Sequence, residues 1–169
     1  MKGENSMEAY LLRHGAAEEA RQSMSDADRS LTTDGRRKLQ QVLQAAKLGD
    51  TKPTLILSSP LKRALQTAEI AKRVLGYKGE ILSSTGLVPG ATVEQAWDEI
   101  RAHRDEASLM LVGHNPLFEN LAPYLLHSPG LQMDFKKGSI VRIDFESFPA
   151  EPRGILRWYL VPKLTGAGG

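Results

Sequence analysis

Three short segments of this sequence carry side chains that could act chemically on an anion. The segments are Arg13-His14-Gly15, Ser58-Ser59-Pro60 followed by Arg63, and Val112-Gly113-His114-Asn115-Pro116. Two guanidinium groups offer paired hydrogen bonds that match the oxygens of a tetrahedral dianion, and two imidazoles can add further contacts to it. The residue types therefore indicate a site for a phosphoryl group rather than for a planar apolar ligand.

His14 is the candidate for a covalent step at such a site. The sequence has no cysteine, and no carboxylate cluster accompanies the three segments, so a neutral histidine nitrogen is the strongest nucleophile that they contain. Neighbouring cations favour the neutral imidazole, whereas a bound phosphate dianion favours the protonated form. The sequence alone therefore leaves the direction of the shift in the pKa of His14 open.

Arg63 is expected at a helix end that is unfavourable for a cation. Ser59 is suited to cap a helix and Pro60 to open it, so Arg63 should lie in the first turn. A positive side chain there is disfavoured by about a few tenths of a kcal/mol, because the helix N-terminus is itself partly positive, unless an anion binds to both. The position of Arg63 therefore indicates a bound anion.

The order of apolar and amphipathic stretches predicts the fold that must position these residues. The expected strands are 9–12, 54–57, 80–83, 109–112, 139–145 and 155–161. Helical periodicity follows Thr33 and Ser59 and covers 93–101 and 117–126. Strands that alternate with helices predict an α/β fold, a three-layer α/β/α sandwich around a mostly parallel mixed sheet of about six strands. The last two strands lack an intervening helix and should form a hairpin at one edge.

Each of the three reactive segments follows one of the predicted strands. The carboxyl ends of parallel strands lie along one edge of a sheet, and ligands of such sheets bind there. In the third segment Gly113 ends a strand, Asn115 is expected to cap the next helix and Pro116 to open it. His114 should therefore lie beside free backbone N–H groups, at the same edge as the other two segments.

Length and composition predict one globular domain. The chain has 169 residues, of which 41% are hydrophobic, and this is enough for one sizeable hydrophobic core. We expect a single domain over residues 1–169, with its core at 8–162 and a flexible tail at 165–169.

Charge, hydropathy and cysteine content limit the expected partners. The chain has 22 basic and 20 acidic residues, and no basic patch is interleaved with aromatic residues, so no nucleic-acid partner is expected. Lys136 and Lys137 should form a solvated turn rather than contact an acidic partner protein. No apolar stretch approaches the roughly 20 residues of a membrane span, and the lack of cysteine fits a reducing compartment. We therefore expect a soluble, cytoplasmic protein that binds no membrane.

Together the three segments resemble the signature of the histidine phosphatase superfamily, branch 1, which has a phosphoglycerate mutase-like fold. The matching motifs are Leu12-Arg13-His14-Gly15, Ser58-Ser59-Pro60 with Arg63-Ala64 and Gln66-Thr67-Ala68-Glu69, and Gly113-His114-Asn115. The resemblance extends over roughly residues 10–126. The short chain and its segment 29–35 are also similar to the compact SixA-type phosphohistidine phosphatases.

The resemblance implies a two-step phosphoryl transfer without a metal or cofactor. His14 would attack phosphorus and become a phosphohistidine, and water would then release phosphate. Arg13, Arg63 and His114 would act in catalysis by binding the equatorial oxygens. Gly15 and Asn115 would complete the phosphate-binding site. The substrate would be a phosphorylated protein or a small phosphoester.

One departure from the family pattern bears on the substrate. In larger members a carboxylic acid after the third strand protonates the leaving group, but residues 82–89 here contain no acid. General acid catalysis typically increases a reaction rate by roughly 10²- to 10⁴-fold. An alcohol leaving group needs this help more than an imidazole that leaves from a labile P–N bond. Phosphohistidine is therefore the expected substrate, although Glu18, Glu19 and Glu94 are candidates for a substitute acid.

Two other functions stay open. A small-molecule phosphomonoesterase of the sugar phosphate type would use the same residues. A non-catalytic module could recognise phosphate through the same pocket, but arginines would suffice for that task, so His14 favours an enzyme. Arg13 and Arg63 also have a structural alternative, an ion pair with a carboxylate such as Asp28 or Glu69, and Asp28 is expected to pair with Arg29.

Overall fold

The computed structural model describes residues 5–166 as a six-stranded sheet with helices on both faces. The strands are β1 (Met7–Arg13), β2 (Leu55–Ser58), β3 (Ile81–Ser83), β4 (Ser108–Gly113), β5 (Ile140–Phe145) and β6 (Ile155–Leu160). The helices are α1 (Thr33–Leu48), α2 (Lys62–Leu75), α3 (Val93–Ala102) and α4 (Leu117–Leu125). Three short 3-10 helices are η1 (Asp26–Asp28), η2 (Thr85–Leu87) and η3 (Pro162–Thr165).

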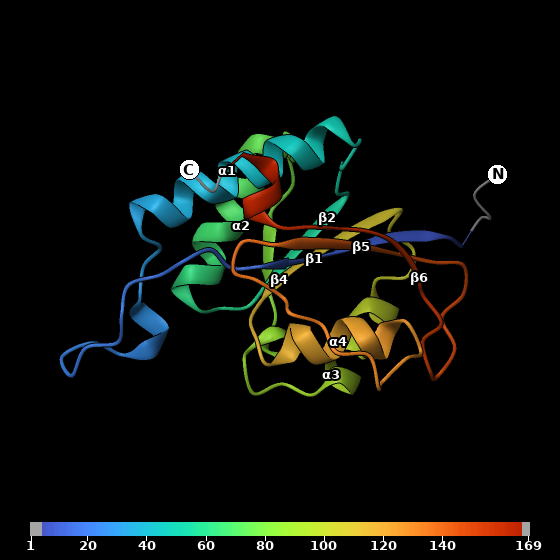
Figure 1. Ribbon diagram of the computed structural model, residues 1–169. Coiled ribbons are helices and arrows are strands. Elements are labelled where there is room, and N and C mark those ends of the chain that lie inside the picture. The colour runs from blue at the N-terminus through green and yellow to red at the C-terminus, as the bar shows by residue number, and fades with distance from the viewer. Residues whose placement is uncertain (1–4, 167–169) are drawn as a thin grey trace.

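The sheet is mixed and mostly parallel, as predicted. Its strand order is β3-β2-β4-β1-β5-β6. The first four strands in this order pair in parallel, whereas β5 is antiparallel to both β1 and β6. Helices α1 and α2 cover one face, and α3 and α4 cover the other (Figure 1). The predicted α/β/α sandwich with a hairpin at one edge is therefore confirmed.

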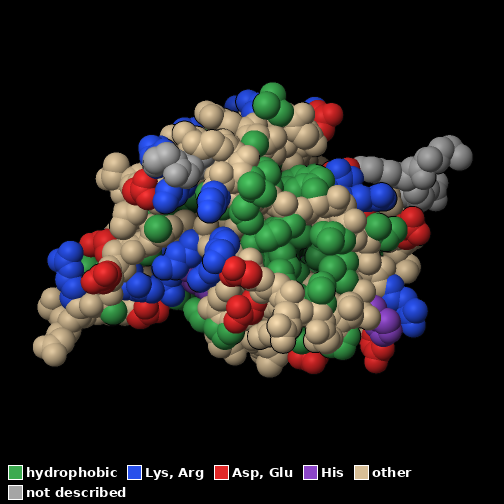
Figure 2. All heavy atoms as spheres, in the orientation of Figure 1, with side chains coloured by type: hydrophobic (Ala, Val, Ile, Leu, Met, Phe, Trp, Pro, Cys, Tyr) green, Lys and Arg blue, Asp and Glu red, His purple; other side chains and the backbone are tan. Residues whose placement is uncertain are grey.

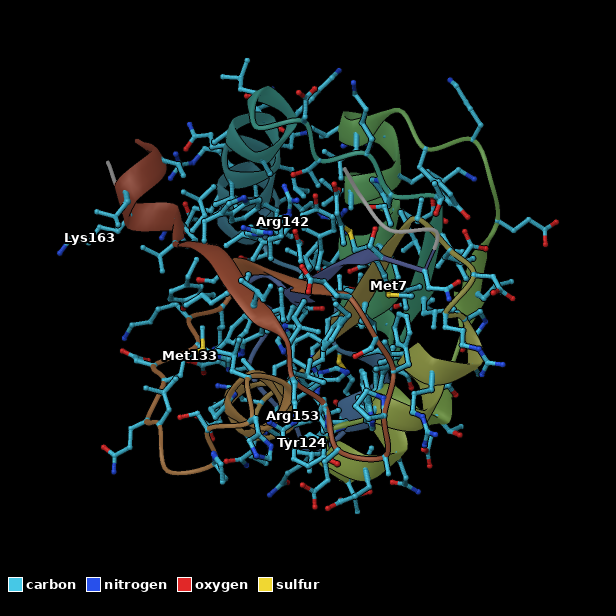
Figure 3. All side chains as sticks on the ribbon, turned by 90° about the vertical axis from the view of Figure 1, so that its right-hand side faces the viewer. Met7, Tyr124, Met133, Arg142, Arg153 and Lys163 are labelled. Atoms are coloured by element: carbon cyan, nitrogen blue, oxygen red, sulfur yellow. The ribbon has the colours of Figure 1, made fainter. Side chains whose placement is uncertain are left out.

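Alternate residues of the central strands pack into two hydrophobic cores, one on each face. In β1, Leu11 belongs to the core under α3 and α4, while Tyr10 and Leu12 belong to the core under α1 and α2. Figure 3 shows Tyr124 of α4 and Arg142 of β5 on opposite sides of the sheet. Because both faces are covered, the central strands are buried along nearly their whole length. Polar groups of these strands are therefore confined to the strand ends and the loops behind them.

The start of α2 differs from the prediction. The helix begins at Lys62, with Leu61 in the N-cap position and no side-chain cap, rather than at Pro60. The Ser59 hydroxyl accepts a hydrogen bond from the N–H of Leu61 at 3.3 Å and pairs with the His114 ring at 2.8 Å. Arg63 still lies in the first turn, so the expected clash between its charge and the helix N-terminus is present.

Two further boundaries differ from the sequence analysis. Helix α4 has Pro116 rather than Asn115 at its N-cap, without a side-chain cap. Thr165, placed in the expected flexible tail, is the last residue of η3, and the tail residues 167–169 lie outside the described residues. No helix within residues 5–166 is long and apolar enough to cross a membrane.

The start of α1 packs closely on the backbone that follows β1. A Cβ at Gly35 would overlap with the backbone oxygen of Ala16. The same oxygen accepts a hydrogen bond of 2.9 Å from the N–H of Thr32, the N-cap residue of α1. The glycine therefore allows the helix to approach the loop that carries the residues next to His14.

We expect Gly35→Ala to lower the free energy of unfolding by about 1–3 kcal/mol, because a methyl group here meets backbone that must shift. This loss should outweigh the better helix propensity of alanine. Urea denaturation followed by circular dichroism measures the change. Gly90→Ala is the matched control, since a Cβ there meets no atom within 4 Å; equal stability of the two variants would contradict the close approach.

Candidate active site

The carboxyl ends of β1, β2 and β4 lie side by side and bring the three predicted segments together. Arg13 pairs with Gly113, and Ser58 pairs with Val112, in the parallel ladders. The ladders continue by one residue, because the N–H of His14 donates to Gly113 O at 3.0 Å and the N–H of Ser59 donates to Val112 O at 2.9 Å. The residues after these strands therefore meet at one edge of the sheet.

Two imidazole rings form the centre of this edge. His14 and His114 have ring centroids 5.0 Å apart, and their residues are only 6% and 1% exposed. His14 Nδ1 lies 2.7 Å from the backbone oxygen of Gly15. A carbonyl oxygen can only accept a hydrogen bond, so the neutral ring carries its proton on Nδ1. The lone pair of the ring is then on Nε2, which is the nitrogen available for nucleophilic attack.

The surroundings of His14 favour its neutral form. Burial is the main cause, and it lowers the pKa of His14 to about 4. Repulsion from Arg63, Arg13 and Lys137 acts in the same direction, while the hydrogen bond to Gly15 opposes it. The unliganded site therefore holds an uncharged, nucleophilic imidazole at neutral pH, which answers the question that the sequence left open.

His114 is held by β2 across the sheet edge. Its Nε2 lies 2.8 Å from the hydroxyl of Ser59, whereas its Nδ1 is buried without a hydrogen-bond partner in the described part of the chain. Burial, followed by repulsion from His14 and Arg63, lowers the pKa of His114 to about 3. The neutral ring can therefore accept from the Ser59 hydroxyl at Nε2 and offer an N–H at Nδ1.

Arg63 enters the site from the first turn of α2 and is 4% exposed. Its Nη1 donates to the backbone oxygen of Asp26 at 2.9 Å, and its Nη2 lies 3.2 Å from the Asp26 carboxylate. The ion pair considered from the sequence, with Asp28 or Glu69, is therefore formed with Asp26 instead.

Asp26 is the acidic residue that the sequence analysis missed. Its carboxylate also lies 3.0 Å from Nε of Arg29, so Arg29 pairs with Asp26 rather than with Asp28 as expected. Partial burial acts to raise the pKa of Asp26, but attraction to Arg63 and Arg29 outweighs it, and the pKa is lowered. Asp26 is therefore ionised at neutral pH and is a poor proton donor.

Arg13 is held by the loop before β5. Its Nη1 donates to the backbone oxygen of Phe135 at 2.6 Å. The Asn115 amide donates to the same oxygen and to the Glu119 carboxylate, in both cases at 3.2 Å. Asn115, predicted to bind phosphate, is thus linked to the site through the oxygen that also orients Arg13.

Gly15, also predicted to bind phosphate, has its N–H engaged inside the protein. It donates to the Thr67 hydroxyl at 3.2 Å, and that hydroxyl donates to the backbone oxygen of Arg63 at 2.7 Å. Thr67 therefore connects the end of β1 to the first turns of α2. It lies within a motif noted in the sequence, but only the structure assigns it this contact.

Three buried donors at the site have no hydrogen-bond partner among residues 5–166. They are Nε of Arg13, Nε of Arg63 and Nδ1 of His114. Buried donors are normally satisfied, because each unpaired group costs about 1–3 kcal/mol. Two of the three belong to cations, so an oxyanion is the ligand that these groups fit.

None of the three acids considered as proton donors has a hydrogen bond or ion pair to His14, Arg13, Arg63 or His114 within residues 5–166. Glu18 accepts a hydrogen bond of 2.9 Å from the N–H of Ser30, Glu19 is exposed, and Glu94 lies in the first turn of α3. At the position after β3, the buried Ser84 donates to Glu99 at 2.6 Å. Within the described chain no group of three or more histidine and acidic side chains could hold a metal ion.

The comparisons with known proteins agree with this geometry. The sequence profile of the histidine phosphatase superfamily (branch 1) matches residues 9–87. An uncharacterized protein of Picosynechococcus sp. is 36% identical over 139 residues, which cover 80% of this chain and 83% of that protein.

Solved structures are similar over nearly the whole chain. A protein from Agrobacterium tumefaciens, assigned as the phosphohistidine phosphatase SixA, has a TM-score of 0.80 and 28% identity, covering 92% of this chain and 98% of its own. A protein histidine phosphatase SixA in complex with tungstate has a TM-score of 0.80 and 25% identity, covering 92% and 97%. With the strand ends, the paired imidazoles and the sequence match in agreement, this chain belongs to the histidine phosphatase superfamily, branch 1, and is similar to SixA.

Proposed function

We propose that the protein is a metal-independent phosphatase that hydrolyses phosphohistidine on a protein substrate through a phosphorylated His14. One observation carries the proposal: the buried, neutral His14 has its Nε2 lone pair free beside unpartnered donors on Arg13, Arg63 and His114. A nucleophile next to cationic donors is what phosphoryl transfer requires. The tungstate bound to a related SixA supports an oxyanion site.

In the first step the Nε2 lone pair of His14 attacks phosphorus. A P–Nε2 bond forms while the bond from phosphorus to the substrate nitrogen breaks, and Nδ1 keeps its proton, which it donates in a hydrogen bond to Gly15 O. Arg13, Arg63 and His114 donate to the equatorial oxygens, where charge is concentrated in the transition state.

The substrate nitrogen can depart without a protein acid. A phosphorylated imidazole that carries a proton on its other nitrogen leaves as a neutral imidazole, whereas an alkoxide must be protonated as it leaves. The carboxylate beside Arg63 belongs to Asp26, whose lowered pKa makes it a poor donor, and β3 is followed by Ser84 rather than by an acid. This donor-poor site supports phosphohistidine over phosphoesters.

In the second step water attacks phosphorus and the P–Nε2 bond breaks. The bonding electrons return to Nε2, and because Nδ1 has kept its proton, His14 leaves as a neutral imidazole. The proton lost by water passes to phosphate or to solvent. The chemistry of the two leaving groups is thus the same, which is a further argument for a histidine substrate.

All of these residues belong to the proposed single domain, whose core is residues 8–162. Gly15 and Asn115 act beside the phosphate as positioning residues, since Gly15 is tied to Thr67 and Asn115 shares the Phe135 oxygen with Arg13. The proposed location is the cytoplasm, in keeping with a chain that has no cysteine.

We expect His14→Asn to reduce phosphate release by at least about 10³-fold, because asparagine cannot form the covalent intermediate. The assay measures phosphate release from a phosphohistidine protein and from an aryl phosphate, with a metal chelator present. His127→Asn is the matched control, since His127 is exposed beyond α4 and asparagine tolerates its positive φ of 55°. Phosphate binding without turnover in the native chain would instead indicate a non-catalytic module.

We expect the native chain to hydrolyse phosphohistidine at least about 10²-fold faster than phosphoserine, from the magnitude of general acid catalysis. Both phosphoamino acids are to be placed in the same peptide, and kcat/KM compared. Equal rates, or faster hydrolysis of a sugar phosphate, would replace the proposal by a small-molecule phosphomonoesterase.

The ring of His14 should titrate near pH 4 in the free protein. Because the unfolded chain binds this proton from about pH 6.5, the contribution of His14 to stability is lost as the pH falls from about 6.5 towards 4. Inorganic phosphate should raise the pKa of His14, since a dianion stabilises the imidazolium. NMR titration of the ring protons with and without phosphate measures both effects. A midpoint at 6.5 that does not respond to phosphate would contradict the buried, anion-binding site.

A further inference from the structure

A cationic groove lies directly beside the candidate active site, and of the residues that line it the mechanism uses only Arg13 and Gly15. Its volume is about 800 Å³, and it is bounded by the end of β1, the start of α1, the loop before β5 and the residues after β6. The uncharged residues that line it are small or apolar, among them Gly15, Ala16 and Pro162. Figure 2 shows Lys and Arg side chains gathered on this side of the molecule, next to an area of hydrophobic side chains.

Positive charge dominates the lining of the groove. The charged residues that line it are Arg13, Lys38, Lys136, Lys137, Lys163 and Asp134. The single carboxylate, Asp134, lies 2.7 Å from Lys136 Nζ, and Lys38 pairs with Asp34 at 3.1 Å. Both pairs are solvent-exposed and therefore weak. Lys137 and Lys163 form no ion pair within residues 5–166, and Lys163 points away from the protein body (Figure 3).

The groove continues into the catalytic centre. Arg13 and Gly15, the neighbours of His14 in sequence, both line it. The N–H of Gly138, which also lines the groove, donates to the backbone oxygen of His14 at 3.0 Å. The charge of Lys137 contributes to the lowered pKa of His14. The groove therefore borders the catalytic centre, within reach of a substrate that has its phosphoryl group at His14.

The groove and the catalytic centre suit different anionic groups. The catalytic centre uses buried guanidinium and imidazole groups in fixed positions, which suit one compact dianion. The groove instead presents flexible lysines around a wide floor, and these suit several carboxylates spread over a surface. Such a distribution of charge is found on an acidic segment of a protein.

We propose that this groove docks an acidic segment of the phosphoprotein substrate, next to its phosphohistidine. The proposal rests on the proposed phosphohistidine phosphatase function and adds to it the chemistry of the substrate surface. It also reverses the expectation that Lys136 and Lys137 form only a solvated turn, because the structure places them in a groove with Lys38 and Lys163. Lysines at an interface rim mainly raise the association rate, so their effect should appear in kcat/KM and should weaken with salt.

Two phosphohistidine peptides test the proposal directly. They share one sequence, except that the residues flanking phosphohistidine are glutamate in one and glutamine in the other. The native chain should hydrolyse the glutamate peptide with a kcat/KM at least 10-fold higher at low salt. In the triple variant Lys38→Gln, Lys136→Gln, Lys163→Gln this preference should fall below 3-fold. Lys137 is left unchanged because its charge reaches His14.

A matched triple variant controls for net charge. Lys47→Gln, Lys52→Gln and Lys78→Gln alter exposed lysines in the last turn of α1 and in the loops before β2 and β3, at the opposite end of the sheet. This variant should keep the native preference. Both triple variants should hydrolyse an aryl phosphate at the native rate. Equal loss of preference in the two variants would overturn the proposal, as would a native chain without any preference.

A binding measurement separates failure of the groove from failure of the proposed function. A phosphate-free peptide of ten glutamates should inhibit aryl phosphate hydrolysis by the native chain, and at least 10-fold more weakly in the groove variant than in the control variant. If neither phosphohistidine peptide is hydrolysed but this difference is found, the substrate assignment fails and acidic docking stands. If inhibition is equal in all three chains, or if only a small polyanion such as citrate inhibits, acidic docking is wrong whatever the substrate.

Discussion

The alignment of three parallel strand ends is the constraint on which the site depends. The ladders of β1, β2 and β4 continue past the strands through the N–H groups of His14 and Ser59. These two hydrogen bonds set the position of His14 beside Gly113 and of Ser59 beside the ring of His114. A slip of one residue would turn every side chain of the strand to the other face of the sheet. The two buried cores, which hold the register, therefore also hold the catalytic geometry.

Buried positive charge is the second organising feature. Arg63 donates to the backbone oxygen of Asp26, and Arg13 donates to that of Phe135. Each guanidinium also has a buried Nε without a hydrogen-bond partner in the described chain. Their charges help to keep the imidazole of His14 neutral. The same arrangement that prepares the nucleophile thus attracts the anion on which it acts, because both effects come from cations in a site with little solvent.

Local patterns predicted the elements well and their ends less well. Apolar runs located all six strands. The signal is strongest for the central strands β1 and β4, because strands buried on both faces need continuous apolar sequence. The predicted start of α2 is two residues too early, because the N-cap position is held by Leu61, although the Ser59 hydroxyl accepts from the N–H of Leu61 as well as pairing with His114. Similarly, Asp28 is the nearer neighbour of Arg29 in sequence, yet Asp26 forms the ion pair. Ser59 and Asp26 also contact segments far away in sequence, through His114 and Arg63, and local patterns do not show these contacts.

The sequence by itself determined the fold class and the reactive residues of the site. It predicted an α/β fold, and it placed Arg13, His14, Arg63 and His114 after strands that end at one edge of the sheet. These follow from residue type and hydrophobic period, which are local properties of the chain. The tertiary structure alone decided the tautomer of His14, the partner of Arg63 and the groove beside them. Each of these depends on atoms from segments far apart in sequence, whose distances are set only when the two cores have packed.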